Sequence, residues 1–351
     1  MEGLPSKQSD RSKSRQYSYN SPVAKVLRVD CASENKQIVK NGFYLINETQ
    51  VDIQEELQSS INNSIHYHYN HRFPVLKRKT EGVCETNFNV VNCGAIQAAM
   101  DVHNSFKSSA TTSTSSTIDS ITNHIGILNF ASAKNPGGGY LRGASAQEES
   151  LCRSSLLYPC LHQYEDIRDH YYQINRGKRN DFGTFYRNCA IFSPLVPIIR
   201  DDSPSTFLLE EKFLASFVTS PAPNKSALIQ QHKNGSKPGK RNKKGVETNV
   251  LSSTENKQLQ KVMVQRIKTI LNIFEVNRCT DLILGAFGCG VFGNDPGFVS
   301  AVFHHVIRKE YKGVFRSVTF AIWTPPKCVN PMEDPNYSAF MNEFSTCGEG
   351  S

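Results

Sequence analysis

The sequence predicts an α/β fold with a mixed, largely parallel central sheet. Short apolar runs rich in β-branched residues alternate with segments whose apolar residues recur at helical spacing. This alternation is typical of parallel sheets, because a helix usually makes the crossover between two parallel strands. The 351 residues are enough to bury a substantial core. No apolar run reaches the roughly 18 residues that a membrane span requires, so we expect no membrane segment.

Each element follows from a local pattern. Residues 87–92 (NFNVVN) predict a strand that leads into an Ala-rich helix over 93–103. Residues 125–130 (IGILNF) predict a buried strand, and a helix is expected over about 146–162. A long helix over 259–277 has Ile267, Ile270 and Phe274 at helical spacing. The other expected elements are a helix at 55–65, strands at 189–192, 196–200, 213–219 and 281–285, a helix at 296–309 and a final strand at 315–323.

Composition divides the chain into a core and several biased segments. Residues 1–25 are rich in Ser and are predicted to be a disordered tail. An N-terminal, helical extension is expected over 26–84, and the α/β core over 85–330. The core is interrupted by a Ser/Thr-rich loop at 108–120 and by a basic insert at about 225–256, which is predicted to be disordered. Residues 331–351 are expected to be a C-terminal tail.

The excess of positive charge lies outside the core. The chain has 40 Lys and Arg against 32 Asp and Glu, a formal net charge of +8. Residues 1–30 and the run 233–245 (KNGSKPGKRNKKG) together account for all of it. A nearly neutral core is not a basic platform, so we expect no sequence-specific nucleic acid as a partner. The insert is either a solvated loop or a patch for nuclear localisation or polyanion contact.

The ten cysteines predict reduced thiols. No two of them form a C-x-x-C pair, and their scattered spacing fits neither a zinc site nor the disulfide framework of a short secreted chain. The first residues also lack the apolar stretch of a secretory signal. We therefore expect a nuclear or cytoplasmic protein.

Three consecutive glycines, Gly137, Gly138 and Gly139, follow the strand at 125–130. Such a run costs backbone entropy, so it is expected where the backbone must approach a ligand, although a lone run can also be a flexible turn. Gln147, Glu148 and Glu149 open the helix behind it, whose N-terminus suits a phosphate. Adjacent helical residues splay by roughly 100°. One carboxylate is therefore expected to hold a substrate hydroxyl while the other acts on the scissile bond, unless both merely complement the helix dipole.

A second glycine loop, LGAFGCGVFGNDPG over 284–297, also links a strand to a helix. Its Gly288, Gly290 and Gly293 match the dinucleotide pattern G-x-G-x-x-G, but the following strand ends without the acid that would hold a ribose. Two loops that are each suited to bind an anion favour a single ligand that contains a diphosphate. Phe287 and Phe292 either stack on that ligand or pack in the core.

The segment NFASAKNPGGGYLRGASAQEESLCRSSLLYPCL over 129–161 resembles the catalytic signature of microbial-type poly(ADP-ribose) glycohydrolases, members of the macrodomain superfamily. The family pattern is GGG, six to eight residues and QEE, and seven residues separate Gly139 from Gln147 here. Three further segments resemble the same family, namely IFSPLVPIIRDD over 191–202, TSPAPN over 219–224 and GAFGCGVFGNDP over 285–296. The resemblance spans about residues 85 to 325.

The resemblance implies a three-layer α/β/α macrodomain with a helical N-terminal extension. It implies that Glu149 is the catalytic acid/base, that Glu148 orients the terminal ribose hydroxyls and that Gln147 supports the acids and the loop. The other implied substrate-binding residues are Asn135 at the loop mouth, Gly137, Gly138 and Gly139 near the diphosphate and ribose, and the second phosphate loop of Gly288, Gly290, Val291, Phe292, Gly293 and Asn294, with Phe292 against the ribose.

The implied reaction is hydrolysis of the ribose–ribose O-glycosidic bonds of poly(ADP-ribose). Protonated Glu149 donates to the departing hydroxyl, and its carboxylate then activates water. The expected substrate is poly(ADP-ribose) or ADP-ribosylated protein, handled by a monomer without cofactor or metal. Three alternatives stay open: a hydrolase of protein-linked mono-ADP-ribose, a non-catalytic ADP-ribose reader, and an NAD-dependent oxidoreductase based on the second loop. The cluster HYHYNH over 66–71 is either a metal site or a surface strand or helix end.

Overall fold

The computed structural model describes residues 21–74, 76, 85–110, 123–176, 183–235 and 251–345. Its strands are β1 (Phe43–Ile46), β2 (Thr49–Asp52), β3 (Ile65–Tyr67), β4 (Asn87–Val91), β5 (Ile125–Phe130), β6 (Ala190–Arg200), β7 (Leu208–Ser220), β8 (Asp281–Leu284) and β9 (Ser317–Ala321). Its α-helices are α1 (Pro22–Asn41), α2 (Gln54–Asn62), α3 (Ala95–Ala110), α4 (Gln147–Ser154), α5 (Leu157–His162), α6 (Tyr171–Asn175), α7 (Lys225–Gly235), α8 (Ser253–Val276), α9 (Pro296–Glu310) and α10 (Pro335–Ser345). Short 3-10 turns occur at η2 (Tyr140–Arg142), η4 (Gly183–Phe185) and η5 (Pro331–Glu333).

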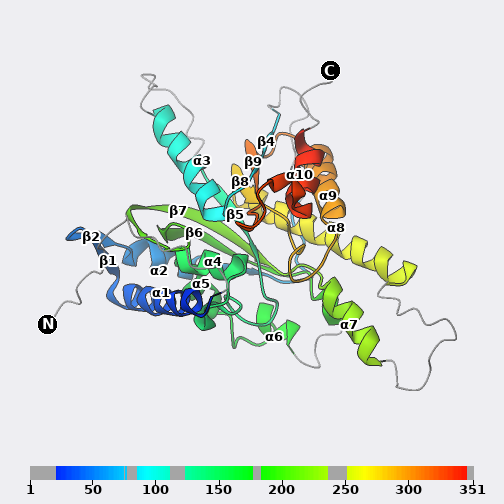
Figure 1. Cartoon of the computed structure of the whole chain (residues 1–351), viewed down its shortest axis with the longest axis horizontal. Coiled ribbons are helices and arrows are strands. Elements are labelled where there is room, and N and C mark those ends of the chain that lie inside the picture. The colour runs from blue at the N-terminus through cyan, green and yellow to red at the C-terminus, as the bar shows by residue number, and fades with distance from the viewer. Residues whose placement is uncertain are drawn as a thin grey trace.

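A mixed seven-stranded sheet forms the centre of the described structure, in the order β3-β6-β7-β5-β8-β9-β4 (Figure 1). Strands β7, β5, β8, β9 and β4 run parallel to one another. Strand β6 pairs antiparallel with β7, and β3 pairs antiparallel with β6. The prediction of a mixed, largely parallel sheet is confirmed.

Helices cover both faces of this sheet, and residues of each strand alternate between them. Ile127 of β5 belongs to a core that includes residues of α1 to α5, whereas the adjacent Leu128 packs with residues of α8, α9 and α10. Successive side chains of a strand point to opposite faces, so each of the strands β4 to β9 contributes to both cores. The structure is thus the expected three-layer α/β/α fold.

Three of the described helices, α1, α8 and α9, begin where the sequence offers a capping side chain. The Ser21 side chain accepts a hydrogen bond from the Ala24 N–H at the start of α1, and Ser252 and Glu255 form a capping box at the start of α8. The Asp295 side chain accepts a hydrogen bond from the Phe298 N–H at the start of α9, and Pro296 lies in the first turn of this helix. The long helix expected at 259–277 therefore begins earlier, at Ser253.

Within the described residues, the segments near both ends of the chain contain more regular structure than expected. The N-terminal extension is not only helical, because β1 and β2 form a two-stranded sheet and β3 joins the edge of the central sheet. Helix α1 starts within the range 1–25 that was predicted to be disordered. The expected C-terminal tail contains α10, which buries Phe340 and Phe344 in the core beside α9. Apolar side chains at helical spacing stabilise this last helix.

Three internal predictions also differ from the structure. The helix expected over 146–162 is divided into α4 and α5, because Ser155 is extended and the Leu156 N–H donates to the Pro197 carbonyl of β6. The strands at 189–192 and 196–200 are one strand, β6, with a register shift between Ser193 and Val196. The ends of the predicted basic insert are helical, in α7 and α8, and residues 236–250 lie outside the described residues. The predicted Ser/Thr-rich loop at 108–120 begins inside α3, and its residues 111–120 likewise lie outside the described residues.

None of the helices in the described ranges is both long and apolar enough to cross a membrane. The eight described cysteines form no disulfide with one another.

Candidate active site

The two glycine loops leave the sheet at the same edge. Strand β5 precedes the first loop and β8 the second, and these two strands are parallel neighbours. Strand β7, on the other side of β5, is followed by the turn at 221–224. The carboxyl ends of parallel strands lie at one edge, which is where ligands bind in open α/β sheets. The fold thus brings together three segments that are up to about 150 residues apart in sequence.

Glu149 has one engaged and one unengaged carboxylate oxygen. Its Oε1 accepts a hydrogen bond of 2.7 Å from the Gly139 N–H, which ties the helix α4 to the glycine run. Its Oε2 is buried and has no hydrogen-bond partner among the described residues. A carboxylate that is fixed at one oxygen and unpartnered at the other is well arranged to exchange a proton with a bound ligand.

Glu148 lies deeper and is held on both sides. Its Oε2 accepts a hydrogen bond of 2.7 Å from the Ser132 N–H, and Asn129 Nδ2 approaches its Oε1 at 3.4 Å. Burial raises the pKa of the Glu148 carboxyl to about 8, and the neighbouring charge of Glu149 raises it too, against the opposing hydrogen bond from Ser132. Glu148 therefore keeps its proton at neutral pH in the absence of ligand.

Gln147 anchors the helix to the end of β5. Its Oε1 accepts from the Phe130 N–H at 2.9 Å, and its Nε2 donates to the Leu128 carbonyl at 2.8 Å. Both ends of the amide are thus engaged with backbone, so its position suits the support of the two acids.

The glycine run comes into direct contact with both carboxylates. Gly138 has a φ of +58°, and a Cβ atom there would lie 2.5 Å from Glu149 Oε1 and 3.0 Å from Glu148 Oε2. A side chain at this position would occupy the space of the acids. Gly137 and Gly139 are similarly crowded, by Tyr158 and Ala144 respectively. Asn135 is exposed at the mouth of this loop, where its carbonyl accepts from the Gly138 N–H at 3.0 Å.

The second loop is closed by Asn294. Its buried Nδ2 donates to the Gly288 carbonyl and to the Pro223 carbonyl, each at 2.9 Å. The turn after β7 thereby holds the loop, and Gly288 has no room for a side chain because a Cβ would lie 2.4 Å from Ala222. Val291 at the tip is 80% exposed, and Gly290 faces open space. Gly293 is backed by the Ser226 side chain.

The two phenylalanines of the second loop have different environments. Phe287 is fully buried and its ring packs against Phe130 at 5.7 Å, so it is a core residue and not a ligand contact. Phe292 is only partly buried, which leaves it accessible to a ligand.

Comparisons with known proteins identify a family model and solved structures that are similar to this chain. Residues 32–201 match the family model for the catalytic domain of microbial-type PARG. The structure of the poly(ADP-ribose) glycohydrolase from Thermomonospora curvata is similar over 90% of this chain and 99% of that chain, with a TM-score of 0.69 and 28% identity. The chain therefore contains a microbial-type PARG catalytic domain.

Two ligand-bound PARG structures are also similar. The Thermomonospora curvata enzyme with the inhibitor ADP-HPD has a TM-score of 0.67 and 28% identity, over 90% of this chain and 99% of that one. The Deinococcus radiodurans enzyme with ADP-ribose has a TM-score of 0.61 and 28% identity, over 83% of this chain and 97% of that one. No curated protein sequence matches the chain significantly.

Sequence reasoning did not identify several residues that shape this PARG site. Asn129 bridges Glu148 and Thr219, and the Ser132 hydroxyl accepts from the Lys134 and Asn135 N–H groups. Asn129 and Ser132 lie inside the signature segment, but only their contacts in the structure show that they hold the site. The same is true of Ala222 and Ser226, which contact the second loop.

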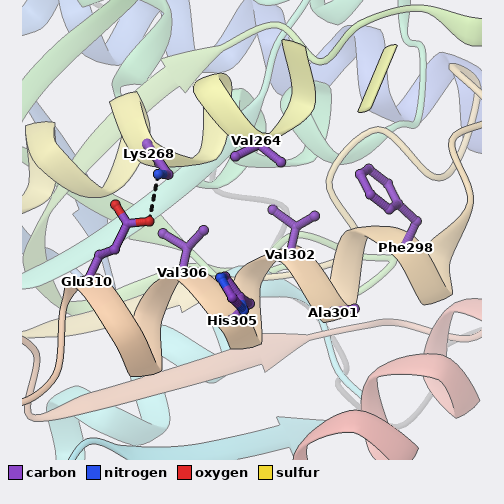
Figure 2. A pocket seen from close by; sticks show the side chains of 8 residues that line it. All are labelled: Val264, Lys268, Phe298, Ala301, Val302, His305, Val306 and Glu310. Atoms are coloured by element: carbon purple, nitrogen blue, oxygen red, sulfur yellow. Dashed lines mark ion pairs between the residues drawn. The ribbon is translucent and has the colours of Figure 1, made fainter. Parts of the chain in front are cut away.

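Two other candidate sites contain none of the residues that were predicted for the active site. A surface cavity of about 300 Å³ lies between α8 and α9, lined mainly by apolar side chains and by the Lys268–Glu310 ion pair of 2.6 Å (Figure 2). None of the predicted site residues lines it. The histidine cluster at 66–71 begins in the edge strand β3. Within the described ranges, no group of three or more His, Cys, Asp or Glu side chains is arranged to hold a metal ion.

The buried Glu148 predicts a pH-dependent loss of stability. Its folded-state pKa of about 8 lies above its ordinary value of 4.5, so between these pH values the unfolded chain releases a proton that the folded chain retains. Its contribution to the free energy of unfolding therefore falls as the pH rises from 5 to 8, by a few kcal/mol at most, since each unit corresponds to about 1.4 kcal/mol. Glu148→Gln should remove this dependence, measured by urea unfolding at several pH values. The exposed Glu55→Gln should retain it; equal pH profiles for wild type and Glu148→Gln would contradict the prediction.

Proposed function

We propose that this PARG-family chain hydrolyses the ribose–ribose O-glycosidic bonds of poly(ADP-ribose) and releases ADP-ribose. The observation that carries the proposal is the arrangement of Glu149, which is fixed by the Gly139 N–H at one oxygen and unpartnered at the other. The proteins it resembles are named poly(ADP-ribose) glycohydrolases, and one of them holds ADP-ribose. A macrodomain glycosidase is therefore the function that fits both the site and the family.

In this proposal, Glu149 transfers the protons of the reaction. Its protonated form donates to the departing ribose hydroxyl as the anomeric carbon acquires positive charge, and its carboxylate then takes a proton from the attacking water. Glu148 orients the terminal ribose hydroxyls. Burial raises the pKa of Glu148 to about 8, so Glu148 meets these hydroxyls in its protonated form at neutral pH.

The two loops bind the nucleotide in the same proposal. Gly137 to Gly139 pass beside the diphosphate and the reacting ribose, with Asn135 at the mouth. Residues 288–294 form the second phosphate loop, in which Phe292 meets the ribose. Backbone N–H groups of glycine loops need no positive side chain to bind phosphates, which fits the nearly neutral core.

The deciding experiment is incubation of the full chain with purified poly(ADP-ribose), followed by chromatographic detection of free ADP-ribose. Release of ADP-ribose supports the proposal. Binding of the polymer without release would instead make the chain a reader, and release only from mono-ADP-ribosylated protein would make it a mono-ADP-ribose hydrolase. A monomeric state and a nuclear or cytoplasmic location belong to the same proposal, the location on the basis of the unpaired cysteines.

A further inference from the structure

Arg266 of α8 is fully buried and lies outside the machinery described above. Among the described residues no carboxylate pairs with it, although an unpaired buried charge is costly. Burial lowers the pKa of its guanidinium, which shows the cost of its position. A buried arginine without a carboxylate partner is expected where its hydrogen bonds hold a segment of the backbone in place.

Its hydrogen bonds converge on the segment 185–188. Arg266 Nη2 donates to the carbonyls of Phe185 and Tyr186, at 3.3 and 3.2 Å, and Nε donates to Asn188 Oδ1 at 2.8 Å. Asn188 in turn donates to Thr269 Oγ1 at 2.8 Å, one turn further along α8. Hydrogen bonds at residues 185, 186 and 188 therefore attach the segment that precedes β6 to α8.

The fixed segment contains a strained residue. Tyr186 has a φ of +56°, a left-handed conformation that is uncommon for a bulky side chain. Such conformations persist only where the surroundings impose them, and they cluster at functional sites. The Arg266 hydrogen bonds to the carbonyls of residues 185 and 186 hold the two peptide groups on either side of the Tyr186 Cα.

The strained conformation directs the Tyr186 ring to the second loop. Its centroid lies 6.1 Å from that of Phe292, with the rings tilted by 44°. The segment 224–226 links both parts of the chain, because the Asn224 N–H donates to the Thr184 carbonyl at 2.8 Å and the Ser226 N–H donates to the Phe292 carbonyl at 3.0 Å. Phe292 otherwise sits beside the exposed tip residue Val291.

We propose that Tyr186 and Arg266 are positioning residues for the nucleotide site: Tyr186 supports the Phe292 ring, and Arg266 holds Tyr186. This inference rests on the proposed function, because it assigns Phe292 to the substrate. Neither residue touches the reacting atoms, so both should affect substrate binding far more than the chemical step.

The test compares Tyr186→Asn with Tyr186→Phe. Asn tolerates the left-handed conformation, so the first variant removes the ring without adding strain, and the second keeps the ring and loses only the hydroxyl. We expect Tyr186→Asn to raise the KM for the polymer and the Kd for ADP-ribose about three- to tenfold with little change in kcat, as the loss of one aromatic contact predicts. Tyr186→Phe should bind as wild type. A wild-type KM and Kd for Tyr186→Asn would overturn the inference.

A second set of variants tests the role of Arg266. Lys keeps the charge but cannot reproduce the planar fork that reaches all three acceptors, so Arg266→Lys should raise KM as Tyr186→Asn does. Because both act through Phe292, the double variant should show no further increase. Ile270→Val, in the core on the same helix, should lower stability and leave KM unchanged. Additive effects on KM, or a wild-type KM for a folded Arg266→Lys, would refute the role of Arg266.

The proposed function and the roles of Tyr186 and Arg266 can be refuted separately. A wild-type chain that binds ADP-ribose but releases none from the polymer refutes the proposed function, and the Kd of the Tyr186 variants still tests the inference. A wild-type chain that releases ADP-ribose, with variants that match it, refutes the inference alone.

Discussion

Glu149→Gln is expected to lower the rate of ADP-ribose release from the polymer by about 100- to 10,000-fold, the range that general acid–base catalysis contributes. The amide keeps an oxygen that accepts from the Gly139 N–H, so the loop should keep its shape. It cannot exchange the proton that the reaction needs. Single-turnover hydrolysis measures the loss, and calorimetry with ADP-ribose should give a Kd close to that of wild type.

Two results bear on the assignment of Glu149. The exposed Glu55→Gln serves as the matched control, because it makes the same substitution in the first turn of α2, and it should retain full activity. A fully active Glu149→Gln would remove Glu149 from the mechanism. Full activity together with an inactive Glu148→Gln would move the acid/base role to Glu148, whose pKa of about 8 already keeps it protonated.

Gly138→Ala is expected to lower kcat at least about 100-fold, because a displacement of about 1 Å in a reacting group has an effect of this order. The added Cβ would lie 2.5 Å from Glu149 Oε1, well inside van der Waals contact, so the carboxylate or the loop must move. The left-handed φ of +58° adds a cost of about 1–2 kcal/mol to folding.

Gly183→Ala separates these two effects. Gly183 has nearly the same φ, +56°, but a Cβ there would meet no atom of the described residues within 4 Å. This variant should lose a similar amount of stability in thermal unfolding and keep its activity. If both variants were equally active, the contact between the glycine run and the acids would not matter for the reaction.

Local patterns predicted most elements of the fold. The strands at 125–130 and 281–285 and the helix at 296–309 are found within a residue or two, because each has its own apolar period and, in α9, its own cap. The prediction failed where another segment intervened. Leu156 hydrogen-bonds to Pro197 and divides the expected helix at 146–162, and a strand of three residues, β3, is formed only by pairing with β6. Such partners are distant in sequence and leave no local pattern.

The family, the two glycine loops and the acids at 148 and 149 can be identified from the sequence, because the GGG and QEE segments lie close together in the chain and have a recognisable spacing. The unpartnered oxygen of Glu149, the core position of Phe287 and the place of Arg266 and Tyr186 behind Phe292 are visible only in the folded structure. Hydrogen-bond partners, burial and ring contacts are properties of segments that meet across the sheet edge. They are set by packing, and packing is not encoded in the spacing of any one motif.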